Sequence, residues 1–467
     1  MGWRLRSRGG PSYALAPQTA RLHGRVLMGE VVLFGSPVGV GHVRPLVPLA
    51  QRLLARGIDV VWAISGDPDE PAAKWHDELS ALGVTFVDLD AIAPFEARDT
   101  GGATSVASMV RRVTGRANTV ADSAVAVLRR IVAGRTIVGG VYDFFALWFY
   151  VAAKALGVSR VQVVVSAFPG LLTALPSAAY ANDPVVQEEM AALRARGLEG
   201  FDGPMGAGVV PQLPSLDVIC FSSPRLCTTA PPYAQLLGLH RAALPSIDEL
   251  GELSPEDRSV VSRLAQAREA GSRVVLLSMG TMVMRRARGL GDAHVAFLHE
   301  VYSSLAASAL AQGAIVVAST SVCTTEELGI DVATLGEDAA SRLIAMPFVP
   351  QPLLFAHGLI DLMVMHGGAN TFYEAMLSGV PVVLCPAFAD QGMVSAAATE
   401  LGLGVSVQTV DYPSLEGGLP LAHVAEVALP AMLEDGNRWT ARAQEMADLL
   451  RSEDGLAAAE ALVLAQR

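Results

Sequence analysis

The sequence predicts an α/β protein with two doubly wound parallel-sheet domains that face a cleft. Short apolar segments alternate with longer ones whose apolar residues recur at helical spacing, and this series begins again after residue 260. The chain has 467 residues, enough to bury two large cores. It is 51% hydrophobic and 17% charged, as expected when parallel strands are covered on both faces.

The first half of the chain supplies the elements of one sheet. Strands are expected at residues 31–34, 60–64, 84–89, 137–142 and 161–165, and helices at residues 43–56 and 144–156. Strands that alternate with helices imply parallel pairing with right-handed crossovers. Residues 166–240 are richer in Pro and Gly, and we expect loops and short helices near the mouth of a pocket there. Residues 29–240 should form the N-terminal domain.

The second half supplies the other sheet. Residues 241–259, RAALPSIDELGELSPEDRS, are polar and are predicted to link the domains. Strands are then expected at residues 274–278, 314–318, 343–347, 360–365 and 382–385, and helices at residues 295–312 and 421–467. We place the C-terminal domain at residues 260–440 and a last helix at residues 441–467.

Charge, cysteine content and hydropathy exclude several classes of protein. The chain has 34 Lys and Arg against 46 Asp and Glu, and its net charge of −12 opposes nucleic-acid binding. The four Cys form no paired motif, which fits free thiols in a reducing, cytoplasmic compartment. No apolar run approaches the roughly 20 residues that a membrane span needs, so no stable membrane insertion is expected.

The first 28 residues differ from the rest, with five Arg and no acidic residue. They could be a targeting segment. We favour an over-long start, with Met28 as the natural first residue, and expect disorder in either case.

The segment at residues 342–391 is typical of an anion site. An apolar run is followed by His366-Gly367-Gly368-Ala369-Asn370-Thr371. The Gly pair permits a tight turn, and we expect Asn370 and Thr371 to cap a helix that carries Glu374 in its first turn. Free backbone N–H groups and the helix dipole at such a turn both favour a phosphate.

Further motifs flank this turn in a fixed order. Phe348 and Gln351 precede His366, Asp390 and Gln391 follow the next strand, and Gly280 and Thr281 end an earlier strand. Each of these short motifs, taken alone, also occurs in many turns that have only a structural role. The ordered set is informative, because His366 lies fifteen positions after Gln351, and Asn370 and Glu374 follow that His by four and eight positions.

The N-terminal half carries a candidate base. His42, in Gly41-His42-Val43-Arg44-Pro45, follows the first strand, and at a helix start the dipole would keep its imidazole neutral. Asp143 ends the fourth strand, where it could orient an imidazole or cap a helix. We favour the His–Asp pair over a packing His and a capping Asp.

Together these motifs resemble the signatures of family 1 glycosyltransferases, the UDP-sugar-dependent enzymes of the GT-B fold. The resemblance covers most of residues 30–440 and is strongest at 342–391. It implies two Rossmann-like domains, an N-terminal one that binds the acceptor and a C-terminal one that binds the nucleotide sugar. In the family, the last helix returns to the N-terminal domain.

The resemblance also implies roles for the candidate residues. His366, Gly368, Asn370 and Thr371 would surround the donor diphosphate, with Gly280 and Thr281 as a second turn. Phe348 would stack on uracil, Gln351 and Glu374 would bind the ribose, and Asp390 and Gln391 would bind the sugar hydroxyls. His42 would deprotonate the acceptor, supported by Asp143.

The implied reaction is an inverting, metal-independent transfer of a hexose to a hydroxyl of a small lipophilic acceptor. Glucose from UDP-glucose is the expected donor group, no cofactor is expected, and the protein is expected to be a monomer or weak dimer. Most plant members have Trp where this chain has Phe348. The family often has Asn after the Asp-Gln pair, where this chain has Met393.

Other functions remain open. A sugar-nucleotide epimerase would need additional acidic and basic residues and no acceptor, and a binding protein would have no use for His42 with Asp143. A dehydrogenase is disfavoured because Arg44 replaces the third Gly of a dinucleotide fingerprint. Asp67-Pro68-Asp69 and Asp88-Leu89-Asp90 imitate metal-binding motifs but are expected to be turn and strand-end residues, so no metal is predicted.

Overall fold

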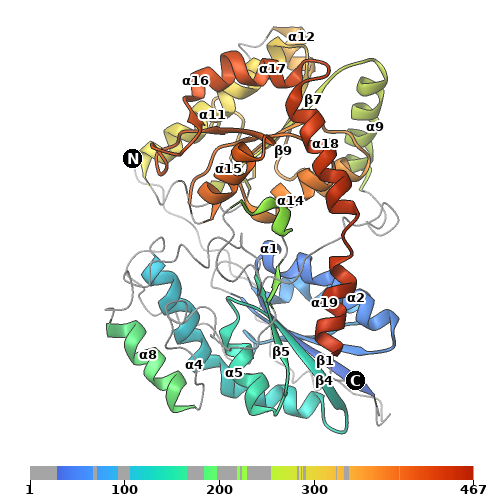
Figure 1. The fold of residues 1–467 in the computed structure, drawn as a ribbon, viewed down its shortest axis with the longest axis vertical. Helices are drawn as coiled ribbons and strands as arrows, with labels where there is room; N and C mark the ends of the chain where they lie inside the picture. The colour runs from blue at the N-terminus through green and yellow to red at the C-terminus, as the bar shows by residue number, and fades with distance from the viewer. Residues whose placement is uncertain are drawn as a thin grey trace, which may run out of the picture.

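Two α/β domains lie one above the other along the long axis of the molecule in a computed structural model (Figure 1). The structure describes residues 29–66, 71–92, 106–165, 184–196, 218–220, 223–228, 254–280, 283–284, 287, 291–321, 323–330, 336–388 and 390–465. The predicted leader, residues 1–28, and most of the predicted linker lie outside these ranges.

The N-terminal domain is built on a six-stranded parallel sheet with the order β3-β2-β1-β4-β5-β6. Its strands are β1 (Glu30–Pro37), β2 (Asp59–Ser65), β3 (Thr85–Asp88), β4 (Thr136–Asp143), β5 (Val161–Val165) and β6 (Val218–Cys220). The first five confirm the sequence prediction. The sixth is three residues long and was predicted to be loop, because so short a segment shows no clear period.

Helices cover both faces of this sheet. They are α1 (Val40–Val43), α2 (Val47–Ala55), α3 (His76–Ala81), α4 (Val106–Ile131), α5 (Leu147–Ala155) and α8 (Pro184–Ala195), with 3₁₀ turns η1 (Arg44–Leu46) and η2 (Ala72–Trp75). A further 3₁₀ turn, η3 (Pro224–Leu226), packs instead on the core of the C-terminal domain through Leu226. The predicted single helix at residues 43–56 is divided, with Pro45 and Pro48 each in the first turn of a new piece. Helix α4 was not predicted, although its buried residues Val113, Ala117, Val120, Ala124 and Leu128 recur at helical spacing.

The C-terminal domain has a seven-stranded parallel sheet with the order β13-β12-β11-β10-β7-β8-β9. Its strands are β7 (Val274–Ser278), β8 (Ile315–Ser319), β9 (Leu343–Met346), β10 (Leu362–Met365), β11 (Val382–Leu384), β12 (Gly404–Val407) and β13 (Gly418–Leu419). The covering helices are α9 (Pro255–Glu269), α11 (Asp292–Ala311), α12 (Glu337–Ser341), α13 (Gln351–Ala356), α14 (Ala369–Leu377), α15 (Gln391–Glu400), α16 (Leu421–His423), η5 (Val424–Ala428), α17 (Leu429–Leu433) and α18 (Arg438–Arg451).

Each sheet has a point at which the strand order reverses direction. In the N-terminal sheet this point lies between β1 and β4, and in the C-terminal sheet it lies between β7 and β10. Ligands of open α/β sheets bind outside the carboxyl ends of the strands at such points. The candidate base follows β1 and β4, and the candidate anion turn follows β7 and β10.

Two predicted boundaries need correction. Helix α9 begins at Pro255, inside the predicted linker, because the Ser254 hydroxyl accepts the Asp257 N–H and caps it. The chain returns to the N-terminal domain after residue 451 rather than at residue 441. Helix α18 packs on α14, and only α19 (Gly455–Leu464) packs on α2, β4 and β5 (Figure 1).

Helix α19 is anchored by charge as well as by apolar contacts. Glu460 is 2% exposed and forms ion pairs with Arg52 of α2 and with Arg56, the C-cap residue of that helix. A buried carboxylate requires such partners. Within the described part of the chain, no helix is long and apolar enough to cross a membrane.

A substitution of Gly139 in β4 tests how closely α19 packs on this strand. A Cβ at this position would lie 2.8 Å from the carbonyl oxygen of Val463. Because a backbone oxygen cannot rotate away, Gly139→Ala should lower the free energy of unfolding by about 1–3 kcal/mol. Urea denaturation measures this. Gly29→Ala is the control, since its Cβ would meet only one atom, at 3.8 Å. Equal midpoints of urea denaturation for the two variants would show that α19 does not pack closely against Gly139.

Candidate functional site

The candidate base, His42, and its partner Asp143 lie at the carboxyl end of the N-terminal sheet. Nδ1 of His42 lies 3.0 Å from Oδ2 of Asp143, whose side chain is fully buried. Oδ1 of Asp143 accepts the Phe145 N–H at 2.9 Å, so both carboxylate oxygens are engaged. This arrangement places the Nδ1 proton toward Asp143, and Nε2 is then the nitrogen that can take a proton from a hydroxyl.

The orientation of His42 depends on its neighbours. Its ring meets Phe145 edge to face at 5.1 Å, and a Cβ on Gly39 would lie 2.8 Å from Cδ2 of His42. Helix α1 has only four residues, and His42 is the third of them. His42 thus lies in the first turn after the N-cap Gly39, at the helix start that was expected, and its Nδ1 also contacts the Asp143 carboxylate.

The candidate anion turn holds an imidazole between two glycines. A Cβ on Gly280 would lie 2.5 Å from Cε1 of His366, and a Cβ on Gly368 would lie 2.6 Å from Nε2. Gly280 has φ +70°, a conformation that also favours glycine. Glycine is required at both positions because the ring occupies the space of their side chains.

Burial makes His366 a neutral group. It lowers the pKa of His366 to about 4, although a hydrogen bond with the Ser278 backbone raises that pKa in part. Nδ1 of His366 has no hydrogen-bond partner within the described chain. An unsatisfied buried nitrogen is costly unless a ligand or water pairs with it. This imidazole can therefore hydrogen-bond a ligand without carrying charge at neutral pH.

Helix α14 begins at Ala369, and its N-cap is Gly368 with no side-chain cap. The expectation that Asn370 and Thr371 cap the helix was wrong, and so was the placement of Glu374 in the first turn, since it is the sixth residue. The Asn370 amide instead donates to the Gly41 carbonyl oxygen in the other domain at 2.8 Å. The N–H groups at the start of α14 thus have no side-chain cap to compete with an anion.

Glu374 and its neighbours form a small polar group. The Gln351 amide donates to Thr371 Oγ1 at 3.4 Å and to Glu374 Oε2 at 3.5 Å. Burial raises the pKa of Glu374 to about 7, and the Gln351 hydrogen bond and the charge of Arg44 lower it in part. Near neutral pH this carboxyl group is therefore divided between its two protonation states.

The remaining predicted donor residues lie around this turn. Phe348, between β9 and α13, is 64% exposed and so presents its ring to solvent. Gln391 is 4% exposed, and its carbonyl oxygen accepts the N–H groups of Ala387 and Phe388 at 2.8 and 3.1 Å. Its NH₂ group is then the end suited to a ligand. Asp390 is the N-cap residue of α15. Thr281 lies outside the described residues.

Two residues that the sequence analysis gave no role belong to this neighbourhood. Arg44 acts on Glu374 from the opposite domain. The Tyr412 ring lies against Gly392, where a Cβ would come within 2.4 Å, and its hydroxyl is hydrogen-bonded to the Gly392 backbone. Tyr412 therefore stands beside Asp390, near the Met393 position where the family often has Asn. Neither contact leaves a local sequence signal, because both join distant segments.

Of the two Asp-x-Asp sequences, the structure describes only Asp88-Leu89-Asp90. Asp90 accepts the Gly66 and Ala72 N–H groups and pairs with Arg116 at 3.0 Å, which is a structural role. Asp67 and Asp69 lie outside the described residues. Among the described residues, no group of three or more His, Cys, Asp or Glu could hold a metal ion.

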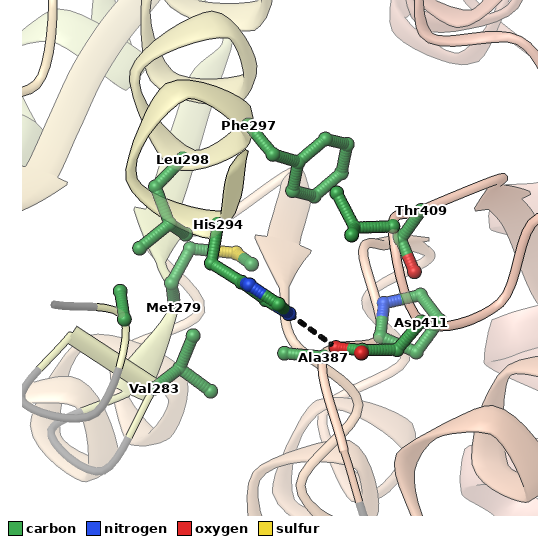
Figure 2. Close-up of a pocket in the computed structure, with 11 residues that line it drawn as sticks. Met279, Val283, His294, Phe297, Leu298, Ala387, Thr409 and Asp411 are labelled. Atoms are coloured by element: carbon green, nitrogen blue, oxygen red, sulfur yellow. Dashed lines mark hydrogen bonds and ion pairs between the residues drawn. The ribbon is translucent and has the colours of Figure 1, made fainter. Parts of the chain in front are cut away.

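A separate apolar pocket lies at the carboxyl ends of β7 and β11, beside the start of α11 (Figure 2). Phe297, Leu298 and Val283 contribute to its apolar wall, and Nε2 of His294 points to Asp411 Oδ2 at 3.0 Å (Figure 2). None of the predicted donor residues lines it. The pocket is therefore distinct from the candidate site, although its Ala387 holds the Gln391 carbonyl oxygen.

Residues 236–416 match the family model described as UDP-glucoronosyl and UDP-glucosyl transferase. The flavonol 3-O-glucosyltransferase UGT71C4 of Arabidopsis thaliana is 33% identical over 113 residues, which are 24% of this chain and 23% of that protein. The chain thus matches less than a quarter of the length of this curated relative.

Solved structures match nearly the whole chain. UGT71G1 of Medicago truncatula, complexed with UDP-glucose, has a TM-score of 0.64 at 16% identity, over 94% of this chain and 99% of that one. The glycosyltransferase VinC, in complex with dTDP, has a TM-score of 0.59 at 18% identity, over 94% and 100% of the two chains. These similarities show the fold. The predicted GT-B arrangement of two parallel-sheet domains is confirmed.

The buried position of the His366 ring can be tested by measuring the pKa of its imidazole. In Gly368→Ala the new Cβ would displace the imidazole toward water, so the pKa of His366 should rise from about 4 toward the ordinary 6.5. Histidine side-chain NMR between acidic and neutral pH measures this, with Gly29→Ala as the control. A pKa that stays near the wild-type value in Gly368→Ala would show that the glycine does not hold the ring.

Proposed function

Because residues 236–416 carry the domain of the UDP-glucosyl and UDP-glucuronosyl transferase family, we propose that the chain is an inverting, metal-independent hexosyltransferase. It transfers glucose from UDP-glucose to a hydroxyl of a small lipophilic acceptor. One observation carries the proposal. The His42–Asp143 pair of one domain lies beside the anion turn of the other, joined through the bond from Asn370 to Gly41.

The proposed reaction has a single displacement step. Nε2 of His42 takes the proton of the acceptor hydroxyl, and the acceptor oxygen attacks the anomeric carbon of the donor. The bond from that carbon to the diphosphate oxygen breaks, and UDP leaves with the electron pair. Attack from the face opposite the leaving group inverts the anomeric centre. Asp143 stabilises the imidazolium ion that forms.

The departing diphosphate needs stabilisation without a metal. The uncapped N–H groups at the start of α14 provide it, together with the neutral His366 ring held between Gly280 and Gly368. Because these groups are fixed before the donor arrives, little reorganisation opposes the reaction.

Recognition of the nucleotide rests on the groups around Glu374. A carboxylate can accept hydrogen bonds from two ribose hydroxyls, of which dTDP has lost one. The relative UGT71G1 is complexed with UDP-glucose and VinC with dTDP, so relatives of this fold hold either nucleotide. The position of Glu374 supports UDP for this chain. Phe348 offers a ring for stacking on uracil, and Asp390 and Gln391 are suited to the sugar hydroxyls.

A sugar-nucleotide-binding protein without transferase activity is the alternative. It would share the anion turn but have no reason to bury Asp143 fully against His42. We propose a cytoplasmic protein that acts as a monomer or weak dimer on its small-molecule substrates.

The test of the function is UDP release from UDP-glucose with EDTA present. It uses phenolic, macrolide and steroid acceptors. Acceptor-dependent release supports a metal-free transferase. The mass of the product identifies the transferred group, and its anomeric configuration shows whether the anomeric centre was inverted. Binding of UDP-glucose without turnover on any acceptor supports the binding protein. Absence of binding rejects the donor assignment.

Removal of the base should abolish most of the rate. His42→Ala should lower kcat by about 10²–10⁴-fold, because no group remains to take the acceptor proton. Asp143→Asn should cause a loss of similar order, since the amide favours the wrong tautomer. Steady-state kinetics measure both, and UDP binding by calorimetry is the control, which should stay near the wild-type value. A His42→Ala variant with wild-type kcat would exclude this residue as the base.

Donor binding should depend on pH through Glu374. Its pKa is raised to about 7, so the accepting carboxylate is lost as the pH falls through that value. The KM for UDP-glucose should therefore rise below neutral pH, by up to about tenfold per pH unit, and reach a plateau above it. Glu374→Gln should remove this dependence and give a uniformly high KM. A wild-type KM that stays flat across this range would contradict the role of Glu374.

A further inference from the structure

We propose that Asn370 of the C-terminal domain is a positioning residue for the base, which holds the backbone that carries His42 and so sets the position of the imidazole relative to the donor. This inference rests on the proposed function. It gives Asn370 a role beyond the diphosphate contact that the family resemblance implies, and it makes proton removal depend on a contact between the two domains.

The Gly41 carbonyl oxygen lacks its ordinary helical partner. In an α-helix this oxygen would accept the N–H of the residue four positions later. That residue is Pro45, which has no N–H. The N–H of Arg44, three positions later, donates to the Val40 carbonyl oxygen. The sequence at the junction of α1 and η1 therefore leaves one carbonyl group to be satisfied by a donor from elsewhere.

Asn370 supplies this donor from the other domain. It is the second residue of α14, and its Nδ2 lies 2.8 Å from the Gly41 oxygen. The approach is close, because a Cβ on Gly41 would lie 3.3 Å from this nitrogen. Beyond the adjacent residues, that Cβ would meet no other atom of the described chain within 4 Å. The absence of a side chain at Gly41 thus serves this one contact.

The bond acts on the backbone of His42, whereas its ring is oriented by other groups. Asp143 contacts Nδ1 at 3.0 Å, and Phe145 meets the ring edge to face at 5.1 Å. Both belong to the N-terminal domain. The Gly41 carbonyl, in contrast, is part of the planar peptide group that joins Gly41 to His42. The N-terminal domain therefore sets the direction of the ring, and Asn370 fixes where the peptide group lies relative to α14.

The same side chain can connect donor binding to the base. A carboxamide has two N–H groups, so Asn370 can donate one to Gly41 and one to an oxygen of the donor diphosphate. The uncapped start of α14 is where that diphosphate is proposed to lie. A bound donor that engages the second N–H would restrain the side chain that holds the backbone of His42.

The experiment perturbs the bond from both sides. Asn370→Ala removes the donor, and Gly41→Ala places a methyl group against the amide without removing it. Gly115→Ala is the matched control, a helical glycine whose Cβ would meet Glu189 Oε1 at an ordinary 3.5 Å. Steady-state kinetics with UDP-glucose use an acceptor that gives turnover in the panel, and calorimetry measures the binding of UDP.

The inference predicts a loss in kcat that exceeds any loss in UDP affinity. Asn370→Ala should lower kcat by about 10–100-fold, because a displaced base is poorly aligned for proton transfer. Gly41→Ala should lower kcat by about 3–10-fold and leave the Kd for UDP unchanged, since the donor-facing groups are intact. In the double variant, Gly41→Ala should cause no further loss, because the amide that it displaces is gone. Gly115→Ala should match the wild type.

Wild-type kcat in Gly41→Ala would overturn the inference. So would wild-type kcat in Asn370→Ala together with a raised Kd for UDP, because the amide would then serve the diphosphate alone. Absence of UDP-glucose binding and of turnover in the wild type rejects the proposed function itself.

A readout without turnover separates these cases. The Nδ1 proton of His42, bonded to Asp143, should give a downfield proton NMR signal that is absent in His42→Ala. Exchange with water should broaden this signal in Asn370→Ala and not in Gly115→Ala. An unchanged signal in Asn370→Ala would show that the amide does not hold the backbone of His42.

Discussion

The hydrogen bond from Asn370 to the Gly41 carbonyl oxygen joins the two halves of the candidate site. Each half is incomplete alone. The N-terminal sheet supplies a hydrogen-bonded imidazole at the carboxyl end of β1, and the C-terminal sheet supplies a turn suited to an anion at the carboxyl end of β10. The bond connects the segments that carry these groups, so the separation between the imidazole and the turn becomes a property of the fold.

The positions of the two imidazole rings also depend on close packing against glycine residues. Gly39 admits the His42 ring, and Gly280 and Gly368 admit the His366 ring. Both imidazoles are thus positioned by the absence of side chains as much as by hydrogen bonds. Such positions cannot accept even a methyl group without moving a ring.

The strand pattern made most of the fold predictable. Short apolar segments such as Val274–Ser278 and Val382–Leu384 are buried along their whole length, so composition alone identifies them. Local capping was less predictable. Asn370 resembles a cap in the sequence, yet Gly368 is the N-cap residue and the Asn370 amide donates to the Gly41 carbonyl oxygen of the other domain. The effect of Arg44 on the pKa of Glu374 and the position of Tyr412 were missed because both depend on segments that are distant in the chain.

Helix α19 comes last in the chain but packs in the N-terminal domain, and this affects how the domains of the molecule are defined. Ala459, Val463 and Leu464 belong to the same apolar cluster as Val32 and Phe34 of β1. The N-terminal unit is therefore discontinuous in sequence, made of the first half and the final helix. A chimera that exchanges N-terminal halves between relatives at one junction would join α19 to a foreign β4 and α2. A transplantable module would need two junctions, one before α9 and one between α18 and α19.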